Sequence, residues 1–411
     1  MKPSVISLYT GAGGLDLGVE AAGYRVAIAV ERDHSACETL RANRPWRLYE
    51  GDVHGLSSTR MCEISGLAPE EADLLIGGPP CQPFSKAAYW RYGDTKRLDD
   101  PRADTLMAYL RVLRDLRPKA FLLENVQGLV FSGKDEGLRL LRHSIDAVNR
   151  TTGTSYSFTV VKVNAADYGV PQTRERVLII GARDGTGLCF PNATHRDPQR
   201  DTLRSSEYPD WLTAWDAIGD LQDDDDPDLR VGGKWGALLP SIPEGENYLW
   251  HTDRGGGRPL FGWRRRYWGF LLKLSKRRPA WTLQAQPGPA IGPFHWRSRR
   301  LSVRELCRLQ TFPDDYYIQG SRMDAQRQLG NAVPPLIGEI AGRAIRDQLL
   351  GRRLRTQPLS LSLVRRRKIP PPEPVRRVPR RYGSQEGFHP PHPGSGMGYA
   401  AAARSIAKDF S

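Results

Sequence analysis

Residues 73–85 read D-L-L-I-G-G-P-P-C-Q-P-F-S, and the other motifs of the chain are interpreted by their relation to this stretch. The apolar run 74–76 has the length of a buried strand and ends at a Gly-Gly pair. Pro79 and Pro80 keep the backbone extended in front of Cys81. Ligands bind at this edge of an α/β sheet, so a cysteine on a rigid loop there is a candidate nucleophile. A structural cysteine beside a proline turn would explain the same residues.

The chain has the composition of a soluble globular protein, and its 411 residues can form two domains. Its sequence contains no apolar run long enough for a membrane span and no secretory signal pattern, so we expect a cytoplasmic protein without a membrane partner. The five cysteines include no C-x-x-C pair. This spacing argues against a disulfide framework and a structural zinc site, and we expect no metal.

Positive charge is concentrated near the C-terminus. Residues 351–411 contain thirteen Lys and Arg against three acids, so they carry +10 of the formal charge of +14. Arginine clusters alternate there with Pro and Gly and show no hydrophobic periodicity, which predicts a disordered tail. The charge could serve solubility, or a salt-sensitive attraction to a polyanion such as nucleic acid.

The N-terminal segment has the pattern of a strand, a glycine turn and a helix. A strand pattern at 4–9 precedes T-G-A-G-G at 10–14, where glycines allow close approach of a ligand to the N-terminus of a helix. A second strand ends at Glu31, about where an acidic residue meets a ribose hydroxyl in nucleotide-binding folds, and Asp52 follows a third. These features predict a nucleoside-type ligand. The dinucleotide spacing G-x-G-x-x-G is absent, which disfavours a dehydrogenase.

Further polar groups adjoin later strand patterns. Glu124 follows the strand pattern 120–123 and could hydrogen-bond or protonate a substrate, or be a surface charge. Gln172, Arg174 and Arg176 alternate, so in an extended segment they would share one face. Two guanidinium groups there could hold an acceptor oxygen or a phosphate, although an exposed charged strand would look similar.

Taken together, these motifs resemble those of the DNA cytosine-5 methyltransferase family. Tyr9 stands where the family usually has phenylalanine, which keeps a flat ring next to the cofactor. The motifs occur in the family's order: the glycine loop at 8–14, G-G-P-P-C-Q-P-F-S at 77–85, E-N-V at 124–126, Q-T-R-E-R at 172–176, R-L-S-V-R-E-L-C-R-L-Q-T-F-P at 300–313, and G-N-A-V-P-P at 330–335.

The resemblance implies an α/β fold, in which a Rossmann-like S-adenosylmethionine-dependent methyltransferase sheet carries helices on both faces and is joined by a smaller, irregular target-recognition domain. Residues 1–185 would form the catalytic and cofactor-binding domain, and residues 186–298 the target-recognition domain. Residues 299–350 would supply a hinge helix and a return segment that completes the first domain. The basic tail would follow from residue 351.

The family's chemistry implies a role for each catalytic motif. Cys81 would add to carbon 6 of cytosine and activate carbon 5, while Glu124 would bond the ring N3 and the exocyclic amine. Arg174 would hold the carbonyl oxygen O2, and Arg176 would support the nucleophile loop or a phosphate. The cytosine would be flipped out of its duplex, with the basic loop 86–100 as a clamp.

The resemblance also implies S-adenosylmethionine as cofactor, S-adenosylhomocysteine as product, and no metal. Tyr9, Gly11 and Gly13 would meet the methionine end of the cofactor. Glu31 would meet the ribose and Asp52 the adenine region. Asn331 would close the site.

Double-stranded DNA is the expected partner, in a nucleoid-associated monomer that could act with a cognate restriction endonuclease. Arg264, Arg265 and Arg266 are candidates for DNA contact, although a basic surface strand fits them as well. Two other functions stay open: an RNA (tRNA) cytosine-5 methyltransferase of the same fold, and a non-catalytic nucleic-acid-binding homologue. The long region 186–298 favours DNA.

Overall fold

The structure is a computed structural model. Cys81, the loop 86–100, and Arg264, Arg265 and Arg266 lie outside the residues that it describes. The described residues are 2–80, 104–127, 136–199, 208–221, 226–262, 268–353, 357–366 and 368–386.

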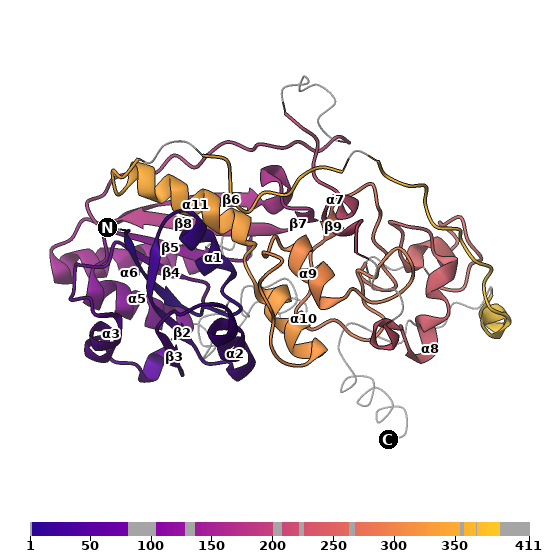
Figure 1. Ribbon diagram of the computed structural model, residues 1–411, viewed down its shortest axis with the longest axis horizontal. Coiled ribbons are helices and arrows are strands. Elements are labelled where there is room, and N and C mark those ends of the chain that lie inside the picture. Colours follow the sequence, from indigo (N-terminus) through magenta and orange to yellow (C-terminus); the bar gives the residue numbers. More distant parts are fainter. Residues whose placement is uncertain are drawn as a thin grey trace.

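Among the described residues, a seven-stranded sheet forms the half of the molecule that contains the N-terminus (Figure 1). Its order is β3-β2-β1-β4-β5-β8-β6, and β8 runs antiparallel to both of its neighbours. The order changes direction between β1 and β4, which is the topological switch point where α/β sheets bind ligands. The strands are β1 (Ser4–Leu8), β2 (Arg25–Glu31), β3 (Leu48–Glu50), β4 (Leu74–Gly77), β5 (Ala120–Asn125), β6 (Ser157–Asn164) and β8 (Glu175–Ala182).

Helices cover both faces of the sheet, which confirms the predicted fold class. One apolar cluster joins alternate strand residues such as Leu75 and Phe121 to α3, α5 and α6, and a second joins Leu74 and Leu122 to α1 and α11. The alternation follows from the two-residue period of a strand. The elements are α1 (Gly14–Ala21), α2 (His34–Asn43), η1 (Val53–Gly55), α3 (Ser58–Ser65), α5 (Asp104–Leu116), α6 (Glu136–Thr152), η4 (Ala165–Tyr168) and α11 (Pro335–Gln348).

Helices α1 and α11 pack with almost no space between their backbones. A Cβ atom added at Gly18 would lie 2.4 Å from the carbonyl oxygen of Pro335 and 2.5 Å from Cα of Gly338. Glycine therefore permits this contact. Through it, a helix from near residue 340 covers a sheet that begins at residue 4.

The second half of the molecule contains little regular structure. An aromatic cluster that includes Tyr248, Phe261 and Phe270 forms its interior, with ring centroids 5.6 to 6.0 Å apart. A second cluster around α9 and α10 joins this half to Ala12 and Leu17 of the first. The elements are β7 (Gln172–Thr173), which pairs with β9 (Ala280–Trp281), then α7 (Ala214–Ile218), η5 (Pro227–Leu229), α8 (Gly233–Gly236), η6 (Leu239–Ser241), η7 (Tyr248–His251), α9 (Val303–Leu309) and α10 (Arg322–Asn331).

The chain beyond α11 does not form the predicted disordered tail over residues 357–366 and 368–386, which we call the C-terminal strap. Figure 1 shows it running from α11 across the second half of the molecule to η9 (Arg380–Gln385). Backbone N–H groups of Ser360 and Leu361 donate to the buried Glu339 carboxylate at 2.8 and 2.9 Å. Lys276, 2% exposed, pairs with Glu373 of the strap at 2.8 Å.

The far end of the strap completes the aromatic cluster of the second half. Tyr382 is 2% exposed and stacks on Trp235 with 5.9 Å between ring centroids, and its hydroxyl donates to the carbonyl oxygen of Lys234 at 2.6 Å. Isolated apolar residues in an extended segment can fill separate surface hollows without any periodic pattern. Hydrophobic periodicity therefore could not reveal this packing.

No helix of the described residues is long and apolar enough to cross a membrane.

Candidate active site

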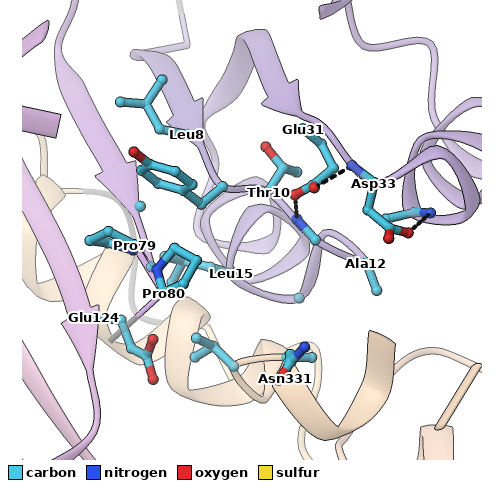
Figure 2. A pocket seen from close by; sticks show the side chains of 18 of the residues that line it. Leu8, Thr10, Ala12, Leu15, Glu31, Asp33, Pro79, Pro80, Glu124 and Asn331 are labelled. Carbon is cyan, nitrogen blue, oxygen red and sulfur yellow. Dashed lines mark hydrogen bonds between the residues drawn. The ribbon is translucent and has the colours of Figure 1, made fainter. Parts of the chain in front are cut away.

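A cavity of about 510 Å³ opens where the carboxyl ends of β1, β2, β4 and β5 meet, at the switch point of the sheet. Figure 2 shows Leu8 and Glu31, from the ends of β1 and β2, on one side of it and Asn331 on the other. Of the predicted site residues that the structure describes, seven line this cavity, and Gly13 and Arg174 do not. The seven are Tyr9, Gly11, Glu31, Asp52, Glu124, Arg176 and Asn331; Pro80, which directly precedes Cys81 in the sequence, lines the cavity as well.

The glycine loop bends sharply between β1 and α1. Tyr9, Gly11 and Gly13 have φ of 56°, 55° and 77°, in the left-handed region that favours glycine. A Cβ atom at Gly11 would meet nothing within 4 Å, so this backbone is open to the cavity. Gly13 does not line the cavity; its Cα faces Leu40 and the Tyr316 hydroxyl, and its role in the structure is to shape the turn.

Glu31 is held by three backbone donors before any ligand is bound. Its carboxylate accepts from the N–H of Gly11 at 2.7 Å and from those of Arg32 and Asp33 at 2.8 Å, and Figure 2 shows two of these bonds. The carboxylate therefore has a fixed orientation at the end of β2. Such an arrangement suits bonding to the hydroxyls of a ribose.

Asp52 lines the same cavity one strand further along the sheet. Its carboxylate caps η1 by accepting from the His54 N–H at 2.9 Å, and it contacts the His54 ring at 2.6 Å and Arg32 at 3.3 Å. These bonds, led by the one from the His54 backbone, lower the pKa of Asp52. The hydrogen bond to Asp52 raises the pKa of His54. Asp52 is thus an ionised acceptor at the β3 end of the cavity.

Glu124 lies at the opposite end, in β5. It is 8% exposed, and burial raises the pKa of its carboxyl group although the nearby Arg176 and Arg174 oppose the shift. The Arg176 Nε lies 2.8 Å from Glu124 Oε1. A Cβ atom at Gly78 would lie 3.0 Å from Glu124 Oε2, so glycine there lets the loop toward Cys81 pass close to this carboxyl group.

Arg174 does not reach the cavity, contrary to the role that we predicted for it at a substrate oxygen. Its side chain is fully buried and donates to the carbonyl oxygens of Gly330 at 2.7 Å and Ala332 at 2.8 Å. The predicted shared face is lost because the segment changes sheets between β7 and β8. Arg174 thereby fixes the backbone on both sides of Asn331, which presents its exposed side chain to the cavity.

A second hollow, of about 630 Å³, adjoins the first where the two halves of the molecule meet. Val126 and Arg176 line both, so the hollows are continuous at Arg176. The second half contributes Arg277 and Trp281, and Trp281 packs edge-on against Trp268, which is 48% exposed. A cationic and aromatic wall of this kind suits phosphates and base faces.

Several cavity residues were not predicted from the sequence. Asp33 accepts hydrogen bonds from Arg327, and this pair ties α2 to α10 at the cavity wall. Gln286 and Asp16 also line the cavity. Neither residue is part of a motif whose role could be assigned from the sequence. The one available signal was L-D-L at 15–17, because an acid between two leucines is unusual in a helix that packs on a sheet.

Comparison with known proteins gives consistent results. The family model described as C-5 cytosine-specific DNA methylase matches residues 3–347. Type II methyltransferase M.SacI of Streptomyces achromogenes is 40% identical over 370 residues, which cover 84% of this chain and 93% of that protein. Type II methyltransferase M.NgoPII of Neisseria gonorrhoeae is 33% identical over 367 residues, covering 84% and 96%.

Solved structures are similar as well. A protein described as a DNA modification methyltransferase encoded within an Escherichia coli prophage is 26% identical in sequence, with a TM-score of 0.57. The match covers 85% of this chain and 100% of that one.

Proposed function

Because the chain belongs to the C-5 cytosine-specific DNA methylase family, we propose that it transfers a methyl group from S-adenosylmethionine to carbon 5 of a flipped-out cytosine in a specific duplex sequence, through a covalent adduct with Cys81. One observation carries the proposal. The ion pair between the buried Glu124 and the partly exposed Arg176, the prolines 79–80 that precede Cys81, and the glycine loop all border one cavity. The relatives' names further suggest that the enzyme acts in a restriction–modification system, with a cognate endonuclease as partner.

The residues of the cavity fit S-adenosylmethionine. Gly11 leaves its backbone open, Glu31 is oriented toward a ribose, and Asp52 stands at the end assigned to the adenine. Tyr9 and Asn331 would border the methionine end. When bound, the cofactor supplies an electrophilic methyl group on a positively charged sulfur.

The protein's own groups would activate the acceptor. Cys81, as a thiolate, adds through Sγ to carbon 6 of the cytosine, and the electron pair moves toward carbon 5 and N3. Burial raises the pKa of Glu124, which favours its protonated form, so Glu124 would donate to N3 and stabilise the negative charge that develops there. Loss of the carbon 5 proton and rupture of the sulfur–carbon bond then release the methylated base.

The geometry changes the assignment of the two arginines. Arg176 borders the cavity and bonds Glu124, so we assign it to the O2 oxygen of the cytosine. Arg174 would act at a distance, by holding the segment that carries Asn331. Both roles are proposals that follow from contacts within the free protein.

The first test asks which polymer is methylated. Labelled S-adenosylmethionine is offered with duplex DNA and, separately, with transfer RNA. We expect label only in DNA. Label only in RNA would instead indicate an RNA cytosine-5 methyltransferase of the same fold, and no label in either would favour a non-catalytic nucleic-acid-binding protein.

The second test replaces the nucleophile. We expect Cys81→Ser to lose all measurable turnover and to retain cofactor and DNA binding, because a serine hydroxyl is a far weaker nucleophile than a thiolate. Duplexes with 5-fluorocytosine at the modified position should give a denaturation-resistant adduct with the wild-type protein and none with the variant. Near-normal turnover by Cys81→Ser would exclude the covalent route.

A further inference from the structure

A buried carboxyl group without a complete set of partners lies in the wall of the cofactor cavity. Asp16 is in the first turn of α1, is 1% exposed, and is one of the residues that line the cavity. Its Oδ1 atom has no hydrogen-bond partner in the structure. A buried acceptor without a donor is costly, and a native protein retains one where a ligand or an ordered water supplies the missing bond.

Among the described residues, the charged groups that most influence Asp16 are acids, not cations. Burial, together with smaller contributions from the nearby Glu20 and Glu31, raises the pKa of the carboxyl group to about 7, although hydrogen bonds from Ser7 and from the Asp16 backbone lower it. The hydroxyl of Tyr316 is also close enough to interact electrostatically. A positively charged donor that entered the cavity would therefore meet an uncompensated acidic site.

We propose that Asp16 is a cofactor-binding residue whose carboxylate accepts a hydrogen bond from the ammonium group of the methionine portion of S-adenosylmethionine. This inference rests on the proposed function. The chemistry of the cofactor selects that group: an ammonium has three N–H donors and a full charge, whereas the sulfonium has no hydrogen to donate. The carboxylate of the same portion would be repelled. The adenine amine is a neutral donor, assigned to the end of the cavity near Asp52.

The experiment measures binding by isothermal titration calorimetry, so that it does not depend on turnover. Three ligands are titrated at pH 7.5: S-adenosylmethionine, S-adenosylhomocysteine, which has the ammonium but no sulfonium, and 5′-methylthioadenosine, which lacks the amino-acid portion. Asp16→Asn keeps the size of the side chain and removes its charge. Glu20→Gln, on the same helix but outside the cavity lining, is the matched control.

We expect Asp16→Asn to weaken S-adenosylmethionine and S-adenosylhomocysteine alike, by about 10-fold to 100-fold, as hydrogen bonds between charged groups predict. Methylthioadenosine binding should change less than about 2-fold, as should all binding by Glu20→Gln. Equal affinities of wild type and Asp16→Asn for S-adenosylhomocysteine would overturn the proposal, and the missing partner would then be a water. Selective weakening of S-adenosylmethionine, or equal weakening of methylthioadenosine, would also overturn it.

A second readout keeps the proposal testable if the affinities change through altered packing. An ammonium favours the ionised carboxylate, so wild-type binding of S-adenosylhomocysteine at pH 6.5 should release protons, measured from the heats in buffers of different ionisation enthalpy. Asp16→Asn leaves Glu20, Glu31, Tyr316 and the nearby Arg44 in place, so the difference between the two proteins isolates Asp16. Equal proton release by both would contradict the proposal.

These results separate this inference from the proposed function. If the wild-type protein bound none of the three ligands, the proposed function would fail. If it bound them with no effect of Asp16→Asn, only the role of Asp16 would fail. Asp16→Ala and thermal melting of each variant check that a weaker affinity does not come from unfolding.

Discussion

The two arginines of Q-T-R-E-R, two residues apart, have different surroundings. Arg174 is fully buried and bonded to backbone carbonyls, whereas Arg176 pairs with Glu124 at the cavity. Two residues along an extended chain face the same way only while the chain stays in one sheet. Here β7 and β8 belong to different sheets, and the alternation rule failed for that reason.

This difference gives a paired prediction. Arg176→Ala should lower kcat by about 100-fold to 1000-fold with little effect on S-adenosylmethionine affinity, since it removes a donor at developing charge. Arg174→Ala should weaken S-adenosylmethionine and lower the melting temperature, because it leaves the carbonyls of Gly330 and Ala332 without donors. Steady-state kinetics, calorimetry and thermal melting measure these effects.

Lys162→Ala is the control for both variants, because Lys162 is an exposed residue of the adjacent strand β6. It should leave all three measurements near wild type. A variant Arg174→Ala with normal cofactor affinity but lost turnover would restore the role that the sequence analysis gave to Arg174.

Asp16 predicts how stability depends on pH in the absence of cofactor. Its folded-state pKa of about 7 exceeds the ordinary value of 3.8 for an aspartate, so the folded protein holds this proton more tightly than the unfolded chain does. Ionisation therefore costs the wild type stability as pH rises through this range, by up to about 1.4 kcal/mol per unit. Asp16→Asn avoids that cost, and its melting temperature relative to wild type should increase from pH 5.5 to pH 8. A difference that stayed constant or decreased with pH would contradict the buried, uncompensated state of Asp16.

At the scale of single elements, most of the sheet could be predicted and the second half could not. The apolar run 74–76 and the strand pattern before Glu124 are hydrophobic on both sides, which is typical of strands buried in a parallel sheet, and both are strands in the structure. The described residues between 208 and 298 instead pack through scattered aromatic contacts and short turns, which have no period to detect.

The close contact between α1 and α11 predicts how adding one methyl group at Gly18 would change the stability of the protein. Alanine normally favours a helix interior over glycine by about 1 kcal/mol. At Gly18 the added Cβ would lie 2.4 to 2.5 Å from backbone atoms of α11, which cannot rotate away, so the clash should outweigh the gain. We expect Gly18→Ala to lower the melting temperature by several degrees, by calorimetry or circular dichroism.

Gly187→Ala provides the comparison for Gly18→Ala. A Cβ atom at Gly187 would meet nothing within 4 Å. The melting temperature should therefore change little. If Gly18→Ala were as stable as this control, the two helices would not be packed as tightly as described.

At the scale of the whole molecule, the C-terminal strap changes what truncation should do. Judged from composition alone, residues 351–411 could be removed with only electrostatic consequences. In the structure, Tyr382 belongs to the interior of the second half, and Glu373 pairs with the buried Lys276. The charge pattern was evident in the sequence, but the packing depends on hollows made by residues far away in the chain.

We therefore expect the strap to matter for stability. A chain that stops at residue 356 should be less stable and should bind DNA more weakly than one that stops at residue 386 and keeps the strap. Tyr382→Ala should reproduce part of this loss, about 3 kcal/mol or more for a buried aromatic side chain. Thermal melting and a DNA-binding titration are the measurements. Equal stability of the chains ending at 356 and 386 would mean that the strap contributes nothing to folding.

The position of α11 in the chain has a consequence for synthesis on the ribosome. Strands β1 to β8 emerge within the first 182 residues, but the helix that shields the Leu74 and Leu122 face comes only after residue 334. Helix α1 covers part of this face, but throughout that interval the part that α11 covers stays exposed on the nascent protein, which invites chaperone binding or self-association. A circular permutant that translates α11 first would shorten this vulnerable period.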